Sequence, residues 1–352
     1  MTSATSTTGG ASGSSNGSEV ALALDIGATK LAAALVDETG RAVRWSSRPT
    51  LRDEGPDRVV RRLLELGERT VANDTIATVG IACGGPLDAD AGLLLGPLHL
   101  PGWDHVPIGP LASERYEVPA TLVNDGSAGA WGEFRWGAAR GTGSMVYVTI
   151  SSGMGGGAVL DGRLLRGATT NGGEFGHVLA RPGGRRCTCG RVGCVEAYVA
   201  GTQLAKRAHE LMAEGRASAL SDLEPVTAER IADLVGTDDL ATELWQDGMD
   251  CLGAALTDLV NVLEPEIVVL GGGLTRSGDL LLEPVRRTIA QDAMRPVART
   301  VQVRLAALGD TAPAVGAGSL ALDRLRAIEQ LSPSDRGRSD HPLLQRPKEH
   351  TP

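Results

Sequence analysis

Aromatic residues are scarce in this chain: Phe, Tyr and Trp together make up 3% of its 352 residues. The hydrophobic core must therefore consist mainly of Ala, Val and Leu. A site for a polyhydroxylated ligand would have to use hydrogen bonds, because few rings are available for stacking. The sequence also lacks an apolar run of the roughly 18–20 residues that span a bilayer. No long basic run accompanies the net charge of −9, so neither a membrane nor a nucleic acid is an expected partner.

Cysteine is rare as well, yet three of the five cysteines fall in one stretch, residues 171–196 (NGGEFGHVLARPGGRRCTCGRVGCVE). There His177 precedes Cys187, Cys189 and Cys194 with the spacing H-x9-C-x-C-x4-C. Disulfide bonds would leave one clustered cysteine unpaired, and a stretch rich in Gly and Arg does not suit a buried apolar cluster. Four such ligands fit a tetrahedral Zn²⁺ site, and a filled tetrahedron leaves no open position for a catalytic water. We therefore predict a structural zinc.

The composition of the two ends of the chain predicts disordered tails. Residues 1–18 are rich in Ser, Thr and Gly and lack the basic start and apolar centre of a signal peptide. Residues 331–352 have a similarly polar composition. A cytoplasmic location follows, and it fits free thiolates available for zinc.

Between the tails, apolar runs of strand length alternate with turn signals and with segments of helical periodicity, which predicts an α/β fold. A length of 352 residues allows two domains. We expect a small lobe over residues 19–138, onto which the helix at 312–330 packs back, and a large lobe over 139–311 that carries the zinc loop. The predicted strands are 20–24, 31–36, 42–46, 78–83, 120–123, 145–150, 157–160, 267–270 and 300–305. The predicted helices are 56–72, 126–139, 202–213, 228–235, 239–263, 280–293 and 312–328, with Thr202 and Thr227 as caps of two of them.

The chain shows a weak internal repeat. With an offset of 124 residues, Asp25 aligns with Thr149 and Asp37 with Asp161, and in both copies a strand enters a small-residue turn and returns as a strand. A looser match relates 267–273 to 78–85. The pattern indicates two related α/β lobes.

Three glycine-rich turns each follow an apolar strand, at residues 27–30, 152–157 and 271–273. Exposed backbone N–H groups in such turns form anion-binding concavities. One such turn is often only a tight turn, but three together favour a nucleotide. Neither the Walker pattern nor a dinucleotide-binding G-x-G-x-x-G at the opening of a βαβ unit is present.

Three carboxylates stand at positions suited to chemistry. Asp125 follows a strand end beside Asn124, where it could cap the next helix or act as a general base toward a substrate hydroxyl. Glu174 and Glu196 flank the zinc ligands and could be solvated surface charges or acceptors for several hydroxyls of a polyol. Local sequence leaves both alternatives open.

The sequence resembles the ROK family of repressors, open reading frames and sugar kinases over residues 20–328. The most specific matches are GEFGH at 173–177, CTCG at 187–190 and GCVE at 193–196. The resemblance implies an actin-like (ribonuclease H-like) ATPase fold with two duplicated lobes and a cleft between them. It also implies an ATP-dependent kinase for a small-molecule polyol, with Mg²⁺ arriving with ATP, and assembly as a homodimer or homotetramer.

The resemblance further implies a role for individual residues. Asp125 would be the catalytic base, and zinc would be held by His177 with Cys187, Cys189 and Cys194. The substrate hydroxyls would contact Gly85, Asn124, Asp125, Glu174, His177 and Glu196. The nucleotide would contact Asp25, Gly27, Ala28, Thr29, Lys30, Ser152, Gly153, Gly155, Gly271, Gly272 and Gly273.

The sequence departs from the family pattern at three places. Ala28 replaces a glycine of the first turn, residues 151–153 replace the usual G-T-G, and Leu98-His99 stand where Pro-Asn is common. These departures count against a plain glucokinase. The sequence resembles actinobacterial kinases of natural-product pathways that phosphorylate C7-cyclitols or amino sugars, and this resemblance implies a kinase for a C7-cyclitol. A glucokinase or another kinase for the 6-hydroxyl of a hexose or aminosugar is the alternative. A sugar-responsive regulator is disfavoured, because only 19 polar residues precede the first strand. A catalytically dead protein is disfavoured, because Asp125 is present.

Overall fold

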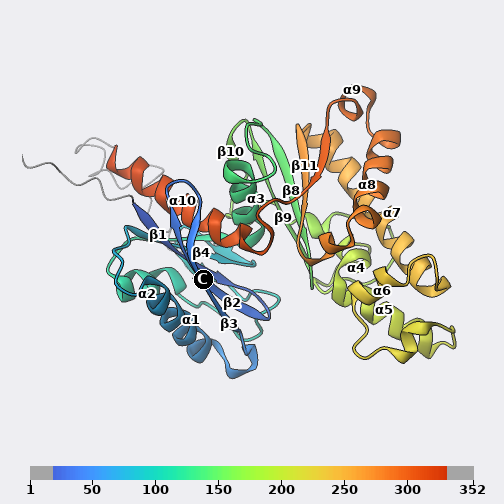
Figure 1. The fold of residues 1–352 in the computed structure, drawn as a ribbon, viewed down its shortest axis with the longest axis horizontal. Coiled ribbons are helices and arrows are strands. Elements are labelled where there is room, and N and C mark those ends of the chain that lie inside the picture. The colour runs from blue at the N-terminus through green and yellow to red at the C-terminus, as the bar shows by residue number, and fades with distance from the viewer. Residues whose placement is uncertain (1–18, 331–352) are drawn as a thin grey trace, which may run out of the picture.

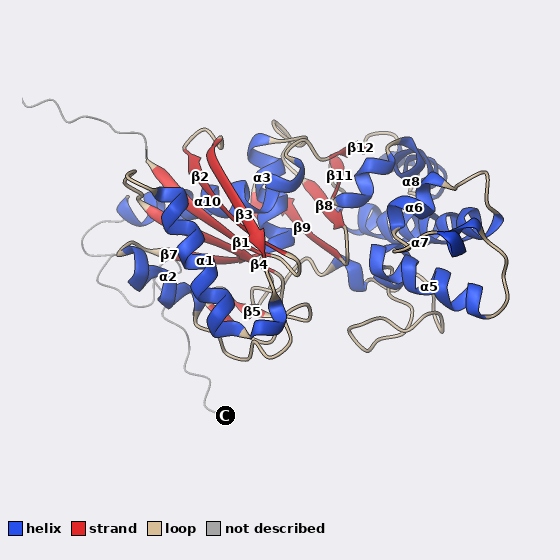
Figure 2. Ribbon diagram, turned by 60° about the horizontal axis from the view of Figure 1, so that its bottom comes forward, coloured by secondary structure: helices blue, strands red, loops and turns tan. Residues whose placement is uncertain are grey.

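The computed structural model describes residues 19–330, so both predicted tails lie outside the described residues. The described chain forms two lobes side by side, each built on a five-stranded sheet (Figures 1 and 2). Within residues 19–330, no helix is both long and apolar enough to cross a membrane.

The sheet of the first lobe has the strand order β3-β2-β1-β4-β7. Its first three strands form an antiparallel meander, while β4 and β7 run parallel to β1. All six residues of β4 are buried, as expected for a central strand covered on both faces. The strands are β1 (Val20–Ile26), β2 (Lys30–Asp37), β3 (Ala42–Pro49), β4 (Thr78–Cys83) and β7 (Ala120–Asn124), with a small separate ribbon of β5 (Leu87–Asp88) and β6 (Leu93–Leu94).

The sheet of the second lobe repeats this arrangement as β10-β9-β8-β11-β12. It again has an antiparallel meander of three strands followed by two strands parallel to the first. The topology thus confirms the duplication that the sequence indicates, with β8 corresponding to β1 and β11 to β4. The strands are β8 (Met145–Ile150), β9 (Met154–Leu160), β10 (Arg163–Leu164), β11 (Ile267–Gly271) and β12 (Gln302–Leu305).

Helices cover both sheets. In the first lobe, α1 (Pro56–Val71) and α2 (Ile108–Tyr116) pack on one face. Buried Val59, Leu63 and Leu66 of α1 join the core there, following the i, i+4, i+7 spacing of an amphipathic helix. The outer face of the second sheet is covered by α4 (Glu196–Val199), α5 (Gly201–Ala213), α6 (Ala228–Asp233), α7 (Asp239–Leu263), α8 (Asp279–Asp292) and α9 (Arg295–Ala298).

Two helices, α3 (Asp125–Trp136) and α10 (Ala312–Glu329), lie between the two sheets (Figure 1). They approach each other closely because glycines face backbone at the crossing. A Cβ on Gly316 would collide with the carbonyl of Ala128, and one on Gly132 would lie 2.7 Å from the carbonyl oxygen of Ala312. Small residues therefore permit backbone contact between the helices that join the lobes.

Glu133 on α3 is fully buried and accepts backbone hydrogen bonds from both segments that connect the lobes. Its Oε2 accepts from Ala138 N at 2.7 Å and from Ala307 N at 3.0 Å, and its Oε1 accepts from Leu308 N at 2.7 Å. These donors compensate the cost of burying the carboxylate.

The structure corrects several details of the predicted elements. The helix at 201–213 begins after Ala200, and the Thr202 hydroxyl does not cap it but donates to the carbonyl of Ser152 at 2.6 Å. Strand β9 begins at Met154 rather than at residue 157, which shortens the second glycine turn. Helix α2, short helix α9 and the β5–β6 ribbon were not predicted. Thr227 does cap α6, as predicted.

Candidate active site and metal centre

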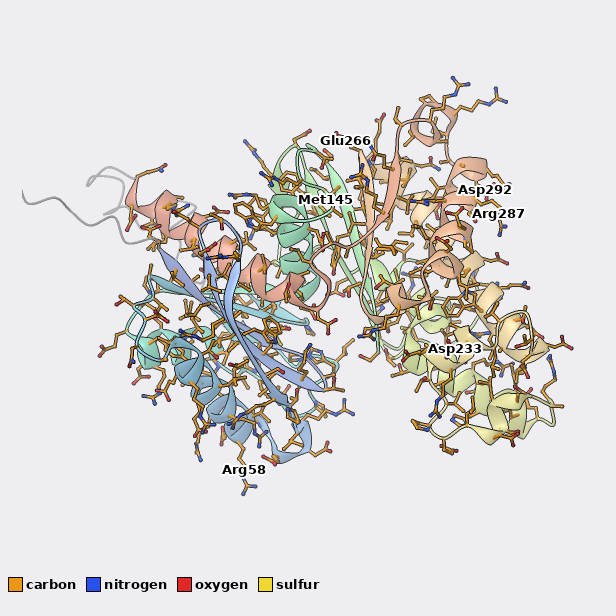
Figure 3. All side chains as sticks on the ribbon, in the orientation of Figure 1. Arg58, Met145, Asp233, Glu266, Arg287 and Asp292 are labelled. Carbon is orange, nitrogen blue, oxygen red and sulfur yellow. The ribbon has the colours of Figure 1, made fainter. Side chains whose placement is uncertain are left out.

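The turns that carry the predicted site follow the carboxyl ends of parallel strands. In the first sheet Asp25 pairs with Ala82, and Cys83 with Asn124, so β1, β4 and β7 end side by side. In the second sheet Thr149 pairs with Gly271 at the ends of β8 and β11. Open α/β sheets bind ligands at this edge. Figure 3 labels Met145, at the opposite end of the second sheet.

Asp125 is the first residue of α3, and its neighbour Asn124 is the N-cap. The cap alternative considered for Asp125 is therefore wrong, because Asn124 Oδ1 accepts from Gly126 N at 2.9 Å and from Ser127 N at 3.2 Å. Asp125 Oδ1 also accepts from Gly126 N, at 2.7 Å. Its Oδ2 lies toward Gly84, 3.6 Å from where a Cβ on that glycine would stand. Capping by Asn124 thus leaves one oxygen of Asp125 turned toward the strand ends.

Glycine contacts fix Asp125 beside the second lobe. A Cβ on Gly126 would collide with the backbone of Gly156 on β9, at 2.6 Å from its nitrogen. Gly173, whose φ is +99°, also packs against Gly156. A Cβ on Gly173 would lie 3.0 Å from the carbonyl oxygen of Gly156. Three segments distant in sequence therefore meet by backbone contact.

Polar side chains from both lobes surround Gly85, which follows β4. Asn124 Nδ2 donates to Glu174 Oε1 at 3.3 Å. A Cβ on Gly85 would lie 3.1 Å from Glu174 Oε1, 3.1 Å from Asn171 Oδ1 and 3.5 Å from Asn124 Nδ2. Burial raises the pKa of Glu174, and the negative charges of Asp125 and Glu196 raise it further. These groups form a compact set of hydrogen-bonding partners.

The segment before Glu174 binds the first lobe directly. Asn171 Oδ1 accepts from Leu87 N at 2.9 Å, and its Nδ2 donates to Leu87 O at 2.8 Å. Thr170 Oγ1 accepts from Ala89 N at 3.0 Å. The side-chain amide of Asn171 therefore pairs with the backbone of Leu87 on β5, as a neighbouring strand would, and this holds Glu174 against Gly85.

Glu196 connects the cysteine-rich loop to the second glycine turn. Its Oε2 accepts from Met154 N at 3.0 Å, and its Oε1 accepts from Thr188 Oγ1 at 2.9 Å and lies 3.4 Å from Cys187 Sγ. The surface-charge alternative for Glu196 is therefore wrong, because the carboxylate is half-buried with partners on both oxygens.

The first glycine turn, residues 27–30, is a tight hairpin closed by Gly27 N donating to Lys30 O at 3.0 Å. Ala28 has no positive φ, so its Cβ is tolerated where the family pattern has glycine. Burial and the negative charge of Asp125 raise the pKa of Asp25 to about 7. Lys30 Nζ is 3.3 Å from Asp310 Oδ2, near the start of α10. Thr29 is the exposed residue of the turn.

A pocket of about 500 Å³ lies on the second lobe beside the second glycine turn. Ser152 and Gly273, both predicted nucleotide contacts, line it. Gly153 and Gly155 belong to the same turn and the start of β9. Figure 3 labels Asp233 of α6, which is also on its wall. The remaining wall comes from Ser151, Gly201, Thr202, Ala205, Val226, Thr227, Ala228, Glu229, Ala232, Leu274, Arg276, Ser277 and Leu280.

Most of these wall residues were not predicted as site residues. Thr202 and Thr227 were predicted only as helix caps. Their position at helix starts was the one feature of the sequence that could have indicated a place in the pocket wall. Conversely, Gly271 and Gly272 do not line the pocket. A Cβ on Gly271 would meet Tyr147 OH at 2.5 Å, and one on Gly272 would meet Ile150 N at 2.6 Å. Both glycines permit close packing of β11 on β8.

The four predicted metal ligands converge on one point. One ligand atom from each of His177, Cys187, Cys189 and Cys194 lies within 4.8 Å of all the others. Cys189 Sγ and Cys194 Sγ are 3.8 Å apart, and Cys187 Sγ is 3.7 Å from His177 Nδ1. A tetrahedron with Zn–S bonds of about 2.3 Å has edges of about 3.8 Å, so the donor set fits Zn²⁺ with Nδ1 as the histidine ligand.

The chain is similar to known sugar kinases. The glucokinase of Thermotoga maritima is 30% identical over 309 residues, which is 86% of this chain and 98% of the relative. The N-acetylmannosamine kinase of Citrobacter koseri is 35% identical over 274 residues, or 77% of this chain and 89% of the relative. A ROK family glucokinase from Streptomyces griseus, solved with glucose and AMPPNP, matches with a TM-score of 0.74 at 30% identity, covering 86% of this chain and 99% of that chain.

The duplicated sheets and the neighbouring structures establish the predicted actin-like α/β fold. The model of the ROK family matches residues 21–324, which include both sheets and the cysteine-rich loop. The chain therefore belongs to the ROK family.

Proposed function

We propose that this protein is an ATP-dependent kinase that phosphorylates the primary hydroxyl of a hexose or N-acylated aminosugar. The observation that carries the proposal is the position of Asp125. One oxygen is occupied by Gly126 N, and the other turns toward Gly84, next to the hydrogen-bonding set around Gly85. A carboxylate so placed can accept the proton of a hydroxyl that is held by Asn124 and Glu174.

The nucleotide would occupy the pocket beside the second glycine turn. Its nucleoside would lie against the wall formed by Thr202, Thr227 and Gly273. Its phosphates would extend toward the turn at 151–153, whose backbone amides suit an anion. Mg²⁺ bound to ATP would neutralise phosphate charge, with Asp25 as a water-mediated contact. Lys30 would exchange its contact with Asp310 for a phosphate oxygen.

In the transfer step, the substrate oxygen forms a bond to the γ-phosphorus while the bond from that phosphorus to the β,γ-bridging oxygen breaks. ADP leaves, and the hydroxyl proton passes to Asp125 Oδ2. Asn124, Glu174 and Glu196 hold the other hydroxyls, so the enzyme contributes mainly positioning and electrostatic stabilisation.

Zinc would fix the loop that supplies Glu174, His177 and Glu196. With Nδ1 of His177 bound to the metal, the other ring nitrogen is available to a substrate hydroxyl, and Glu196 is tied to the loop through Thr188. The metal would act as a structural element, since four protein ligands fill its tetrahedron.

The choice of substrate rests on the relatives. Glucokinases and N-acetylmannosamine kinases resemble this chain over most of their lengths, which favours the hexose alternative over the C7-cyclitol that the resemblance to actinobacterial variants led us to expect. A homodimer or homotetramer remains our expectation from the family resemblance, and light scattering tests the assembly. A cytoplasmic location remains our expectation from the composition of the chain.

An ADP-release assay over glucose, mannose, N-acetylmannosamine, N-acetylglucosamine, kanosamine and a C7-cyclitol tests the function. We expect the highest kcat/KM for one of the hexoses or N-acetyl sugars, and ATP hydrolysis close to background without a sugar. A clear preference for the cyclitol would restore the first substrate hypothesis. No sugar-dependent or cyclitol-dependent ADP release would contradict the kinase assignment.

A further inference from the structure

The pocket beside the second glycine turn has one unpaired positive charge on its wall. Among the described residues that line the pocket, Arg276 is the only lysine or arginine. Its guanidinium has no hydrogen-bond or ion-pair partner within residues 19–330. The carboxylates of Glu229 and Asp233 are on the same wall and do not pair with it. A guanidinium without a counterion is suited to an anionic ligand that enters the pocket.

The guanidinium of Arg276 borders the same space as the hydroxyl of Ser151. A Cβ built on Gly273 would stand 3.4 Å from Arg276 Nη1 and 3.5 Å from Ser151 Oγ. All three residues line the pocket. The missing side chain at Gly273 therefore leaves room in which a ligand atom can contact the guanidinium at the edge of the glycine turn.

The turn that begins at Ser151 has few backbone donors left for an anion. Ser151 N donates to the carbonyl oxygen of Gly153 at 2.8 Å. Met154 N, which follows the turn, donates to Glu196 Oε2 at 3.0 Å. Only the amides of Ser152 and Gly153 lack a partner among the described residues. Two neutral amides carry no formal charge, so a cation at this edge would add the stronger, charge-assisted hydrogen bonds to a phosphate.

The distribution of charge around the pocket favours one orientation of a nucleotide. Helix α6 contributes both carboxylates, and Figure 3 labels one of them, Asp233. Carboxylates repel phosphates but accept hydrogen bonds from ribose hydroxyls and base amines. The segment 273–277 contributes the cation instead. A nucleoside that lies toward α6 would therefore place its first phosphate beside Gly273, within reach of Arg276.

We propose that Arg276 is a nucleotide-binding residue whose guanidinium donates hydrogen bonds to the α-phosphate of ATP. The α-phosphate is common to ATP and ADP and takes no part in the bond changes of the transfer step. Arg276 therefore contributes to the affinity for the nucleotide, and its loss raises KM for ATP with little change in kcat. The inference rests on the proposed function, because it takes this pocket as the nucleotide site.

Other roles for Arg276 predict different binding. A solvated surface arginine contributes nothing to the binding of adenosine, AMP or ADP. A cation that attracts the phosphate chain only at long range contributes more to ADP than to AMP, because ADP carries more charge. A direct contact with the α-phosphate contributes to AMP as much as to ADP and leaves adenosine unaffected. The three roles therefore separate in a comparison of these ligands.

Calorimetry on the full chain, without sugar, measures the Kd of adenosine, AMP and ADP for wild type and Arg276→Gln. We expect the variant to bind AMP and ADP about tenfold more weakly and adenosine equally well. Unchanged affinity for AMP, or a loss confined to ADP, would overturn the inference. Because Arg276 is exposed, added salt should weaken AMP binding to wild type more than to the variant. Equal salt dependence of the two proteins would also contradict the contact.

Arg287→Gln is the matched control. Arg287 is an exposed residue of α8 that lies outside the pocket wall and has no ion pair within residues 19–330 (Figure 3). The control removes the same charge and should leave all three affinities unchanged. An equal loss of AMP affinity in the control would show a general effect of charge and refute the role of Arg276.

Kinetics with sugar separate this inference from the proposed function. If wild type is an active kinase and Arg276→Gln has its AMP affinity, only the role of Arg276 fails. If wild type releases no ADP with any sugar, the kinase assignment fails, while a selective loss of AMP affinity in Arg276→Gln still supports the phosphate contact.

Discussion

Asn124 Nδ2 donates to Glu174 Oε1 at 3.3 Å, and this contact joins the end of β7 in the first lobe to the cysteine-rich segment of the second. The same Glu174 oxygen lies beside Gly85. One carboxylate therefore contacts both the helix cap that positions Asp125 and the space assigned to the sugar.

Glu174→Gln should raise KM for the sugar about tenfold with a smaller change in kcat. Gln keeps the shape but loses the charge, so hydrogen bonds from substrate hydroxyls weaken. Initial-rate kinetics at saturating ATP measure the effect. An unchanged KM for the sugar would place Glu174 outside the substrate set.

Asp125→Asn should lower kcat by about 10²–10⁴-fold, because the amide cannot accept the hydroxyl proton. The fold and sugar binding should persist, since the Asn oxygen can still accept from Gly126 N. Stopped assays measure turnover and calorimetry measures sugar binding. Asp104→Asn, at an exposed residue, is the control and should be fully active. Turnover near that of wild type in Asp125→Asn would exclude this mechanism.

Cys189→Ser should lose both zinc and at least tenfold in kcat/KM for the sugar, because the loop that carries His177 and Glu196 loses its fixed geometry. Metal analysis after gel filtration gives zinc per chain. Cys251→Ser, at a buried cysteine of α7, should retain one zinc per chain. Zinc-free Cys189→Ser with normal activity would show that the metal does not support the sugar site.

Asp25→Asn should stabilise the nucleotide-free protein at pH 8 and have less effect at pH 5. The folded pKa of Asp25, about 7, lies above that of an unfolded carboxyl. The folded state therefore keeps a proton that the unfolded state releases, so stability declines as pH rises from the unfolded pKa to about 7 and stays low above it. Asn removes this decline. Thermal melts from pH 5 to pH 8 should show the variant's advantage growing with pH, and a constant difference would argue against the raised pKa. The variant should also bind Mg·ATP more weakly.

Gly126→Ala should destabilise the protein by about 1–3 kcal/mol and reduce kcat, because the new methyl group meets the backbone of Gly156 and must displace the start of α3. Urea unfolding measures the first effect. Gly143→Ala is the matched control, since a Cβ there meets only a side-chain oxygen, Glu266 Oε1 at 3.1 Å, and no backbone atom. Equal stability of the two variants would mean that α3 moves freely at this contact.

The regular elements were largely predictable from sequence. Strands β4 and β8 and helix α7 have the predicted bounds, because turn residues or caps delimit strong apolar patterns at both ends. Helix α2 was missed because Gly109 and Pro110 in its first turn resemble a loop. Its Pro occupies a position where a free N–H is not needed.

From the spacing of residues alone, the site was predictable only where its residues cluster in sequence, and the resemblance to the family supplied the set around Gly85. His177, Cys187, Cys189 and Cys194 are close along the chain, and their convergence matches the spacing. The wall of the pocket comes instead from the starts of α5 and α6 and from residues 273–280, which meet only through tertiary packing.

Glu133 joins the two segments that connect the lobes. The chain passes between the lobes twice, after α3 and before α10, and both passages donate backbone hydrogen bonds to this one carboxylate. A rotation of one lobe against the other that keeps these bonds must have its axis close to Glu133. Such a rotation would have to break the other hydrogen bonds between the lobes, such as those of Asn171 with Leu87.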